Sequence, residues 1–452
     1  MSIVTFEPRR PMRVAALVVG SVLVLALLGL LSAEPAYAKT FTVDFTVDLP
    51  DADPDDGVCD VSPTVLNFCS LRAAIEEANE FSGADTINFD IPGGGVQTIK
   101  PDSELPEIKE QVTIAGYSQP GAKKNTLSQG NNAELKVQLD GSNAEDAYVD
   151  GLFITADNVV VRGLVINRFG YRGLLVYGDN TRIEGNFIGT NPSGTIDLGN
   201  EADGVTFSTS SESIVGGTAP AARNLISGND GRGVYFSASS TNKVQGNYIG
   251  TDATGKANLG NGESGMLMFL SSQNTVGGSD AGSANVIAFN GSDGVTIDDS
   301  GTGNRILRNS IDSNDVIGID LVGGDESISG TTSNDPKDAD TGPNGLQNKP
   351  EVTSAVNTGG QTTIVGKLNS KPKKTFVIRF FSNLPGPPPE GTTFVGRRSV
   401  STNANGNAPF SFTFAKKVPS GKSITATATD QIGNTSEFGV GPYVGFRGMP
   451  VD

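Results

Sequence analysis

The stretch "GNYIGTDATGKANLGN" (246–261) decides the fold, because a nearly identical stretch, "GNFIGTNPSGTIDLGN" (185–200), precedes it. The two copies lie 61 residues apart, and Gly216 and Gly277 repeat the same separation. A period this long holds more than one structural unit, so the internal pattern of the repeat sets the architecture.

Three short motifs recur in fixed order within this period. The first is N-x-I-x-x-[N/D], with its asparagine at Asn186, Asn224, Asn247, Asn285 and Asn309. The second is x-G-Φ-x-Φ, where Φ is apolar, as in "RGLLV" (172–176), "DGVTF" (203–207), "RGVYF" (232–236), "SGMLM" (264–268), "DGVTI" (293–297) and "IGIDL" (317–321). The third is a short apolar segment after a polar turn: "NTRI" (180–183), "SIV" (213–215), "NKV" (242–244), "NTV" (274–276) and "NRI" (304–306).

Each motif is too short for a helix and alternates like a strand. Three strands per 23 to 38 residues predict a coil of parallel β-structure, because a single turn of chain cannot bury its apolar face alone. The longer turns carry the tail seen in "GTDATGKANLGN", which we interpret as a loop inserted on alternate rungs. We expect the asparagines of the first motif to stack in register and hydrogen-bond to the copies above and below, although amides in such rows could instead bind a ligand.

The two ends of the coil need caps, since a bare end exposes apolar surface and unpaired strand edges. In "CSLRAAIEEANE" (69–80), Ser70 is a candidate N-cap. Four apolar side chains share one face of this predicted helix: Leu71, Ala74, Ile75 and Ala78. From about Pro350 onward, alternating strands separated by turn signals predict an antiparallel β-sandwich of immunoglobulin-like type.

The predicted organisation follows from these patterns. It comprises a signal peptide (1–38), an N-terminal cap region (39–115), a parallel β-helix (116–322), a linker rich in Gly, Asp, Asn and Pro (323–349), and the sandwich (350–446).

The signal peptide is predicted from Arg9, Arg10 and Arg13, an apolar run over 14–31, and the A-x-A cleavage pattern at 36–38. Cleavage would leave Lys39 as the first residue. The alternative is an uncleaved membrane anchor, because the run is long enough to span a bilayer. No second apolar run follows, so we expect no membrane span after cleavage and a secreted or cell-surface location.

The charge and the residue types exclude several classes of function. The net charge is −17, and losing the leader, with its three arginines and two glutamates, makes it −18. A polyanion repels nucleic acids, so we expect no nucleic-acid partner. The chain has no histidine, which excludes Ser-His-Asp and Cys-His catalysis and histidine-ligated zinc. The two cysteines, Cys59 and Cys69, predict a disulfide in an exported protein.

The sequence resembles a known family at several of these motifs. "CSLRAAIEEAN" is similar to the signature of the CSLREA domain of exported bacterial proteins, with Ala73 in place of a glutamate, a change we expect on the helix surface. The rungs resemble right-handed parallel β-helix repeats of the pectin-lyase-like superfamily. "DADTGPNGLQN" (338–348) and "ITATATDQIGNTSEF" (424–438) resemble the tail of the same proteins. The resemblance implies a right-handed β-helix at the cell surface or outside the cell, and no established activity.

Two outward rows of side chains are candidates for chemistry. The middle position of the second motif gives Leu175, Thr206, Tyr235, Leu267, Thr296 and Asp320; its first position gives Arg172, Asp203, Arg232, Ser264 and Asp293. The candidate catalytic cluster consists of Asp293, Asp298, Asp299 and Asp320 with Arg305. The competing interpretation is surface charge that alternates between rungs and stabilises them weakly.

Two loops are candidate calcium sites, and calcium is the only cofactor that the sequence suggests. "DADPDDGVCD" (51–60) offers Asp51, Asp53, Asp55 and Asp56, and "DPKDADTGPNG" (335–345) offers Asp335, Asp338, Asp340 and Asn344. Either loop could equally be a solvated turn.

The sequence therefore favours a non-enzymatic extracellular scaffold for adhesion or glycan binding. The alternative is a polysaccharide lyase or glycoside hydrolase acting through the outward carboxylates. A third possibility is that the sandwich anchors the β-helix in a larger surface assembly.

Overall fold

The computed structural model describes residues 37–62, 68–144, 146–324, 330–384, 386, 389–415 and 417–446. The predicted signal peptide lies outside the described residues except for its last two. Within the described ranges, no helix is long and apolar enough to cross a membrane.

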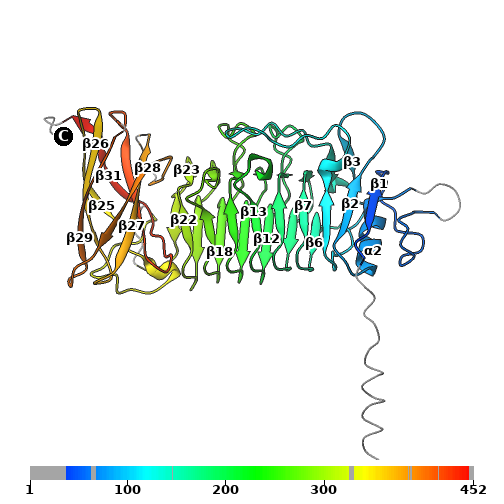
Figure 1. The fold of residues 1–452 in the computed structure, drawn as a ribbon, viewed down its shortest axis with the longest axis horizontal. Helices are drawn as coiled ribbons and strands as arrows, with labels where there is room; N and C mark the ends of the chain where they lie inside the picture. The colour runs from blue at the N-terminus through cyan, green and yellow to red at the C-terminus, as the bar shows by residue number, and fades with distance from the viewer. Residues whose placement is uncertain are drawn as a thin grey trace, which may run out of the picture. The chain divides into compact units, whose positions relative to one another are not determined.

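Three parallel sheets wind around one core and form a right-handed parallel β-helix (Figure 1). The nine-stranded sheet contains β1 (Thr40–Val43), β2 (Asp85–Phe89), β4 (Val112–Ala115), β7 (Val160–Arg162), β10 (Arg182–Glu184), β13 (Ile214–Gly216), β16 (Lys243–Gln245), β19 (Thr275–Gly277) and β22 (Arg305–Leu307). The eight-stranded sheet contains β3 (Gln97–Ile99), β5 (Val137–Asp140), β8 (Leu164–Asn167), β11 (Phe187–Ile188), β14 (Leu225–Ile226), β17 (Tyr248–Ile249), β20 (Val286–Ala288) and β23 (Ser310–Asp312). The seven-stranded sheet contains β6 (Leu152–Ile154), β9 (Leu174–Val176), β12 (Val205–Ser208), β15 (Val234–Ser237), β18 (Met266–Phe269), β21 (Val295–Asp298) and β24 (Ile319–Leu321).

Each sequence motif supplies one sheet. The N-x-I motif forms the eight-stranded sheet, the x-G-Φ-x-Φ motif the seven-stranded sheet, and the third motif the nine-stranded sheet. The prediction that the matched isoleucines line the interior is confirmed, because each is at most 1% exposed: Ile188, Ile226, Ile249, Ile287 and Ile311. Strands β1 to β4 belong to the same sheets, so the segment predicted as an N-terminal cap also contributes strands to the coil.

The predicted asparagine ladder is present, together with two further ladders of the same kind. In each ladder the backbone N–H of one residue donates to the Oδ1 of the asparagine on the next rung. One ladder consists of Asn186, Asn224, Asn247, Asn285 and Asn309. A second consists of Ser213, Asn242, Asn274 and Asn304, and a third of Asn200, Asn229, Asn261, Asn290 and Asn314.

The third ladder corrects the expectation that the last residue of every N-x-I-x-x-[N/D] motif stacks on its copies in the neighbouring rungs. Asn191 and Asp252 occupy its last position in the longer rungs, yet they lie outside the ladder. Their Oδ1 atoms accept backbone N–H groups within the inserted loops, such as those of Ile196 and Ala257. The asparagine at the end of each loop, Asn200 or Asn261, takes the ladder position instead, because the loop displaces the chain before it returns to the coil.

The N-terminal end of the core is covered by α2 (Leu71–Glu80), and the N-cap prediction is confirmed because the Ser70 side chain accepts a hydrogen bond from the Ala73 N–H. The four predicted apolar side chains of this helix pack into the core. The disulfide between Cys59 and Cys69 is formed. The surface position expected for Ala73 is wrong: the residue is fully buried, so a glutamate there would place a charge inside the protein.

Two four-stranded sheets form the C-terminal immunoglobulin-like sandwich. One contains β25 (Glu351–Thr358), β26 (Gln361–Asn369), β29 (Asn407–Phe414) and β32 (Gly445–Phe446). The other contains β27 (Thr375–Asn383), β28 (Thr393–Ser401), β30 (Ser423–Thr429) and β31 (Gly439–Tyr443). Most pairings are antiparallel, although β25 and β32 run parallel.

The sandwich and the preceding segment close the C-terminal end of the β-helix. Asn344 accepts from the Asn304 N–H and Glu390 accepts from the Asn314 N–H, so each extends a ladder by one more acceptor. Phe381 and Phe438 of the sandwich join the core of the coil. The two tail-like sequence segments meet here, since the Asn344 Nδ2 donates to the carbonyl of Thr435.

Candidate functional site

The outward face of the seven-stranded sheet carries the predicted row of side chains in strict register. The row begins one rung earlier than predicted, at Phe153, and continues through Leu175, Thr206, Tyr235, Leu267, Thr296 and Asp320. Leu175, Thr206 and Thr296 are buried, whereas the other four remain partly exposed. The row therefore forms an interrupted strip of mixed apolar and polar character along the coil.

The first position of the motif forms ion pairs between adjacent rungs. Arg172 pairs with Asp150 at 3.5 Å, and Arg232 pairs with Asp203 at 3.5 Å. Asp150 and Asp203 also accept the backbone N–H of their arginine partners. Burial raises the pKa of Asp150 to about 6, against the opposing effect of Arg172. These ion pairs join neighbouring rungs through aspartates that are buried.

The candidate catalytic carboxylates lie on the last rungs of the coil. Asp293 is buried; its Oδ1 accepts from the Ile317 N–H, and its Oδ2 accepts from the hydroxyl of Thr296. Burial raises the pKa of Asp293, although these hydrogen bonds oppose the shift. Asp298 ends β21 and accepts from the N–H of Asp299.

The other members of this predicted cluster are dispersed. Asp320 lies on β24 beside Thr296 of the preceding rung. Arg305 lies on β22, in the nine-stranded sheet, and its guanidinium donates to the carbonyl of Ile432 in the sandwich. Asp203 and Asp293 lie three rungs apart in the register, about 14 Å, which exceeds the spacing of paired glycosidase carboxylates.

Aromatic side chains gather at the first two rungs of the seven-stranded sheet, a feature that the sequence reading missed. Tyr148 packs edge-on against Tyr171 with ring centroids 5.6 Å apart, and Phe153 packs against Tyr177 at 5.8 Å. Tyr148 is 77% exposed and Tyr177 is 43% exposed. Arg172 lies 3.9 Å over the Tyr171 ring. We call Tyr148, Phe153, Tyr171 and Tyr177 the aromatic patch. They lie just outside the repeated motif or one rung before it, so the repeat itself gave no signal.

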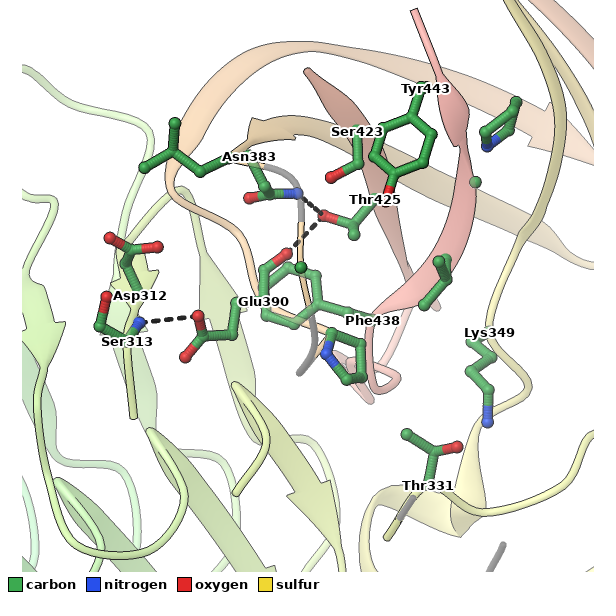
Figure 2. A pocket seen from close by; sticks show the side chains of 16 residues that line it. Asp312, Ser313, Thr331, Lys349, Asn383, Glu390, Ser423, Thr425, Phe438 and Tyr443 are labelled. Atoms are coloured by element: carbon green, nitrogen blue, oxygen red, sulfur yellow. Dashed lines mark hydrogen bonds between the residues drawn. The ribbon is translucent and has the colours of Figure 1, made fainter. Parts of the chain in front are cut away.

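A cavity of about 750 Å³ lies between the end of the β-helix and the sandwich (Figure 2). Asp312 and Glu390 line one side, and Asn383 and Thr425 another. Most of these polar groups already have partners: Asn383 donates to Thr425, and Thr425 donates to the carbonyl of Glu390. This cavity could not be predicted from the sequence, because the residues that line it come from segments far apart in the chain.

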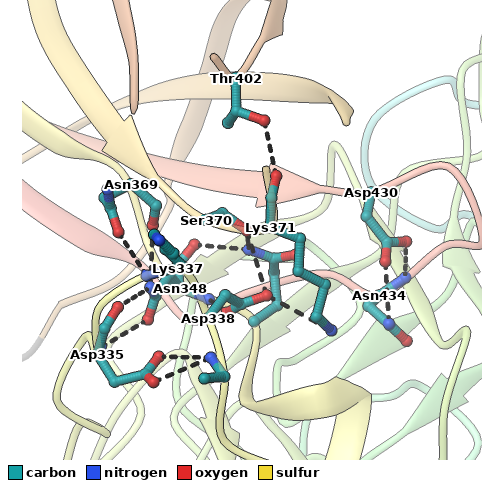
Figure 3. A network of polar contacts seen from close by, with 12 residues as sticks. Asp335, Lys337, Asp338, Asn348, Asn369, Ser370, Lys371, Thr402, Asp430 and Asn434 are labelled. Carbon is teal, nitrogen blue, oxygen red and sulfur yellow. Dashed lines mark hydrogen bonds and ion pairs between the residues drawn. The ribbon is translucent and has the colours of Figure 1, made fainter. Parts of the chain in front are cut away.

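The second predicted calcium loop brings three carboxylates together. One oxygen each from Asp335, Asp338 and Asp340 lies within 4.8 Å of the others. Asp338 accepts a hydrogen bond from the N–H of Asn348 (Figure 3). The Lys371 ammonium lies 3.6 Å from the Asp338 carboxylate. Oδ1 of Asp340 is buried and has no hydrogen-bond partner among the described residues. Three clustered carboxylates suit calcium, but an ion would need further oxygen ligands to reach its usual coordination.

The fourth predicted ligand of this loop is used elsewhere. Asn344 is fully buried, and both ends of its amide are engaged at the end of the β-helix ladder. The sequence could not show that Asn344 has a different role from the neighbouring aspartates, because the ladder residue that it contacts, Asn304, is distant in the chain.

The first predicted calcium loop is organised as a hydrogen-bonded turn. Asp51 accepts from the N–H groups of Asp53 and Asp60 with its two oxygens, and Asp56 accepts from that of Val58. The N–H of Asp55 donates to Glu77 on the helix. This arrangement occupies the carboxylates of Asp51 and Asp56 with backbone donors of the turn.

The calcium hypothesis for the Asp335–Asp338–Asp340 cluster gives a direct prediction. Burial, and then the charges of Asp335 and Asp338, raise the pKa of Asp340 to about 6. Calcium should relieve this repulsion, so we expect it to raise the Tm at pH 7.5, by an amount equivalent to about 2.7 kcal/mol at a hundredfold excess over Kd. The effect should shrink at pH 5, where protons compete. Asp340→Asn should abolish it in thermal melts, whereas exposed Asp280→Asn should not. An equal response in both variants would contradict the hypothesis.

No protein-family model and no curated protein sequence matches the chain. Among solved structures, the chain is similar to the enzymatically active domain of tailspike protein 2 of bacteriophage CBA120, with 13% identity over 90% of this chain and 67% of that one, and a TM-score of 0.23. It is also similar to the Dettilon tailspike protein, with 14% identity over 87% of this chain and 94% of that one, and a TM-score of 0.24. These TM-scores are too low to establish a shared overall structure, so the fold assignment depends on the strand pairing of this chain.

Proposed function

We propose that the protein is a secreted or cell-surface scaffold that binds an extended glycan along the outward face of its seven-stranded sheet. The aromatic patch is the observation that carries this proposal. The face of an aromatic ring is electron-rich and attracts the polarised C–H groups of a sugar. Successive rungs repeat at about 4.8 Å, so the coil presents a regular surface along which a polymer can lie.

The remainder of the outward strip is consistent with such a surface. Tyr235 and Leu267 continue it beyond the aromatic patch, and Arg232 lies over the Tyr235 ring at 4.9 Å. The strongly negative net charge favours neutral glycans over polyuronates. A disulfide-bonded N-terminal region supports an extracytoplasmic location.

We also propose membership of the CSLREA-domain group. The support is the helix that follows Cys69, with its Ser70 cap and its buried apolar face.

The alternative function is a polysaccharide lyase or hydrolase acting through the Asp293–Asp320 region. The raised pKa of Asp293, caused by its burial, is the one feature that favours it, since a general acid requires such a shift. Both Asp293 oxygens, however, accept hydrogen bonds from residues of the next rung or of the same rung, which favours a structural role.

The test is glycan binding to the mature protein by array and then by calorimetry. We expect Tyr148→Ala combined with Tyr177→Ala to raise the Kd at least about tenfold, because two exposed stacking platforms are lost. Tyr443→Ala is the matched control, since it removes an exposed tyrosine from the sandwich instead.

Product analysis for reducing ends and unsaturated sugars separates the two candidate functions. Unchanged binding by the double variant would contradict the proposed surface. Cleavage of a glycan that Asp293→Asn abolishes would establish the alternative.

A further inference from the structure

A buried carboxylate lies against the first residue of the predicted mature chain. Asp85 begins β2 and is 1% exposed. Its Oδ1 accepts a hydrogen bond from the backbone nitrogen of Lys39 at 2.7 Å. The Lys39 carbonyl in turn accepts from the N–H of Thr86, so the nitrogen is held in place where β1 pairs with β2.

This carboxylate is incompletely satisfied in the unprocessed chain. Its Oδ2 is buried and has no hydrogen-bond partner among the described residues. A peptide N–H offers one hydrogen, and it is already given to Oδ1. A buried acceptor without a partner costs free energy. Burial accordingly raises the pKa of Asp85, while the hydrogen bond and positive charge of Lys39 oppose the shift.

The same nitrogen belongs to the bond at which the leader is predicted to be cut. The A-x-A pattern ends at Ala38, which is exposed, immediately before Lys39. Hydrolysis by a signal peptidase consumes one water, leaves a carboxylate on Ala38 and converts the amide nitrogen of Lys39 into an ammonium. An ammonium has three hydrogens and a positive charge, so it can serve both oxygens of Asp85.

We propose that cleavage between Ala38 and Lys39 completes the N-terminal end of the fold, by creating a buried ion pair between the new Lys39 α-ammonium and the Asp85 carboxylate. The ion pair fastens β1, the edge strand of the nine-stranded sheet, onto β2. Processing thus stabilises the exported form relative to the precursor. The inference assumes export but is independent of glycan binding, so the two proposals can fail separately.

The test compares two chains that differ by one residue. One begins at Lys39 and the other at Ala38, each released from a fusion by a protease that leaves no extra residue. Adding Ala38 moves the ammonium one residue away and restores the amide. We expect the Lys39 form to have a Tm higher by roughly 3 °C, because only that form has the ion pair.

Substitution of Asp85 assigns the difference to the ion pair. In Asp85→Asn the two chains should melt at the same temperature, whereas exposed Asp90→Asn should keep the difference. N-terminal sequencing of the secreted protein should begin at Lys39. Equal Tm values for the two Asp85-containing chains, or a secreted chain that begins elsewhere, would overturn the proposal even if Asp85→Asn fails to fold.

Discussion

Replacing Glu390 with alanine is expected to lower the free energy of unfolding by about 3–5 kcal/mol. Glu390 is 6% exposed, and its carboxylate accepts from the Ser313 N–H at 2.7 Å and from the Asn314 N–H at 2.8 Å. It also accepts from the Asn314 side-chain amide. Alanine would leave the buried Asn314 N–H without its acceptor at the last rung and would remove the acceptor of the Ser313 N–H. It would also weaken the contact that holds the sandwich against the coil. Urea unfolding followed by circular dichroism would measure the loss.

Two further variants make this experiment specific. Glu390→Gln should show an intermediate loss, because it keeps one acceptor for Asn314 but presents an NH₂ group towards Ser313. Glu351→Ala should change the stability by less than about 1 kcal/mol, because its ion pair with Lys367 is exposed. Equal stabilities for Glu390→Ala and Glu351→Ala would show that Glu390 does not cap the coil.

The stability of the protein is expected to fall as the pH rises from about 4.5 to about 7. Glu77 on α2 is fully buried, and burial is the main cause that raises its pKa from 4.5 to about 7, with smaller effects from Asp51 and Asp56. Its Oε2 has no hydrogen-bond partner among the described residues. The folded state therefore holds a proton that the unfolded chain releases at lower pH. This contribution to stability is complete below pH 4.5 and is lost by about pH 7, a change of about 3 kcal/mol.

The variant Glu77→Gln isolates this effect. It keeps an acceptor for the Asp55 N–H but removes the buried charge, so it should be more stable than the parent at pH 8 and equally stable at pH 4.5. Glu80→Gln, at the exposed end of the same helix, should leave the pH profile unchanged. Thermal melts across pH 4.5–8 would measure the difference, and parallel profiles for the parent and Glu77→Gln would refute the assignment to Glu77.

The coil could be predicted from sequence because its information is local and repeated. Each motif contains both an inward apolar side chain and a turn residue, as Ile249 and Asn247 illustrate, and stacking follows from the fixed order of the motifs. The helix N-cap at Ser70 could also be predicted, since its hydrogen-bond partner Ala73 lies only three residues away. The sequence did not show that Asn261, and not Asp252, belongs to the third ladder, because this depends on the path of an inserted loop.

The candidate sites were harder to predict because their partners are distant in the chain. Glu390 contacts Asn314, 76 residues earlier, and Asp85 contacts Lys39, 46 residues earlier. Residue type alone made Asp293 resemble a catalytic acid, whereas its hydrogen bond to the Ile317 N–H on the next rung gives it a structural use. Clustering of acids was predictable only where they are close in sequence, as for Asp335, Asp338 and Asp340.

The ladders make the length of this molecule adjustable in discrete steps. The rungs that contain Asn247 and Asn285 each offer three amide acceptors to the preceding rung and three backbone N–H donors to the following rung, so both join their neighbours in the same way. The 61-residue unit spans two rungs, and a tandem duplication would extend the coil by about 10 Å without altering either terminus. Gene duplication can therefore change the length of such a β-helix and leave its two caps unchanged.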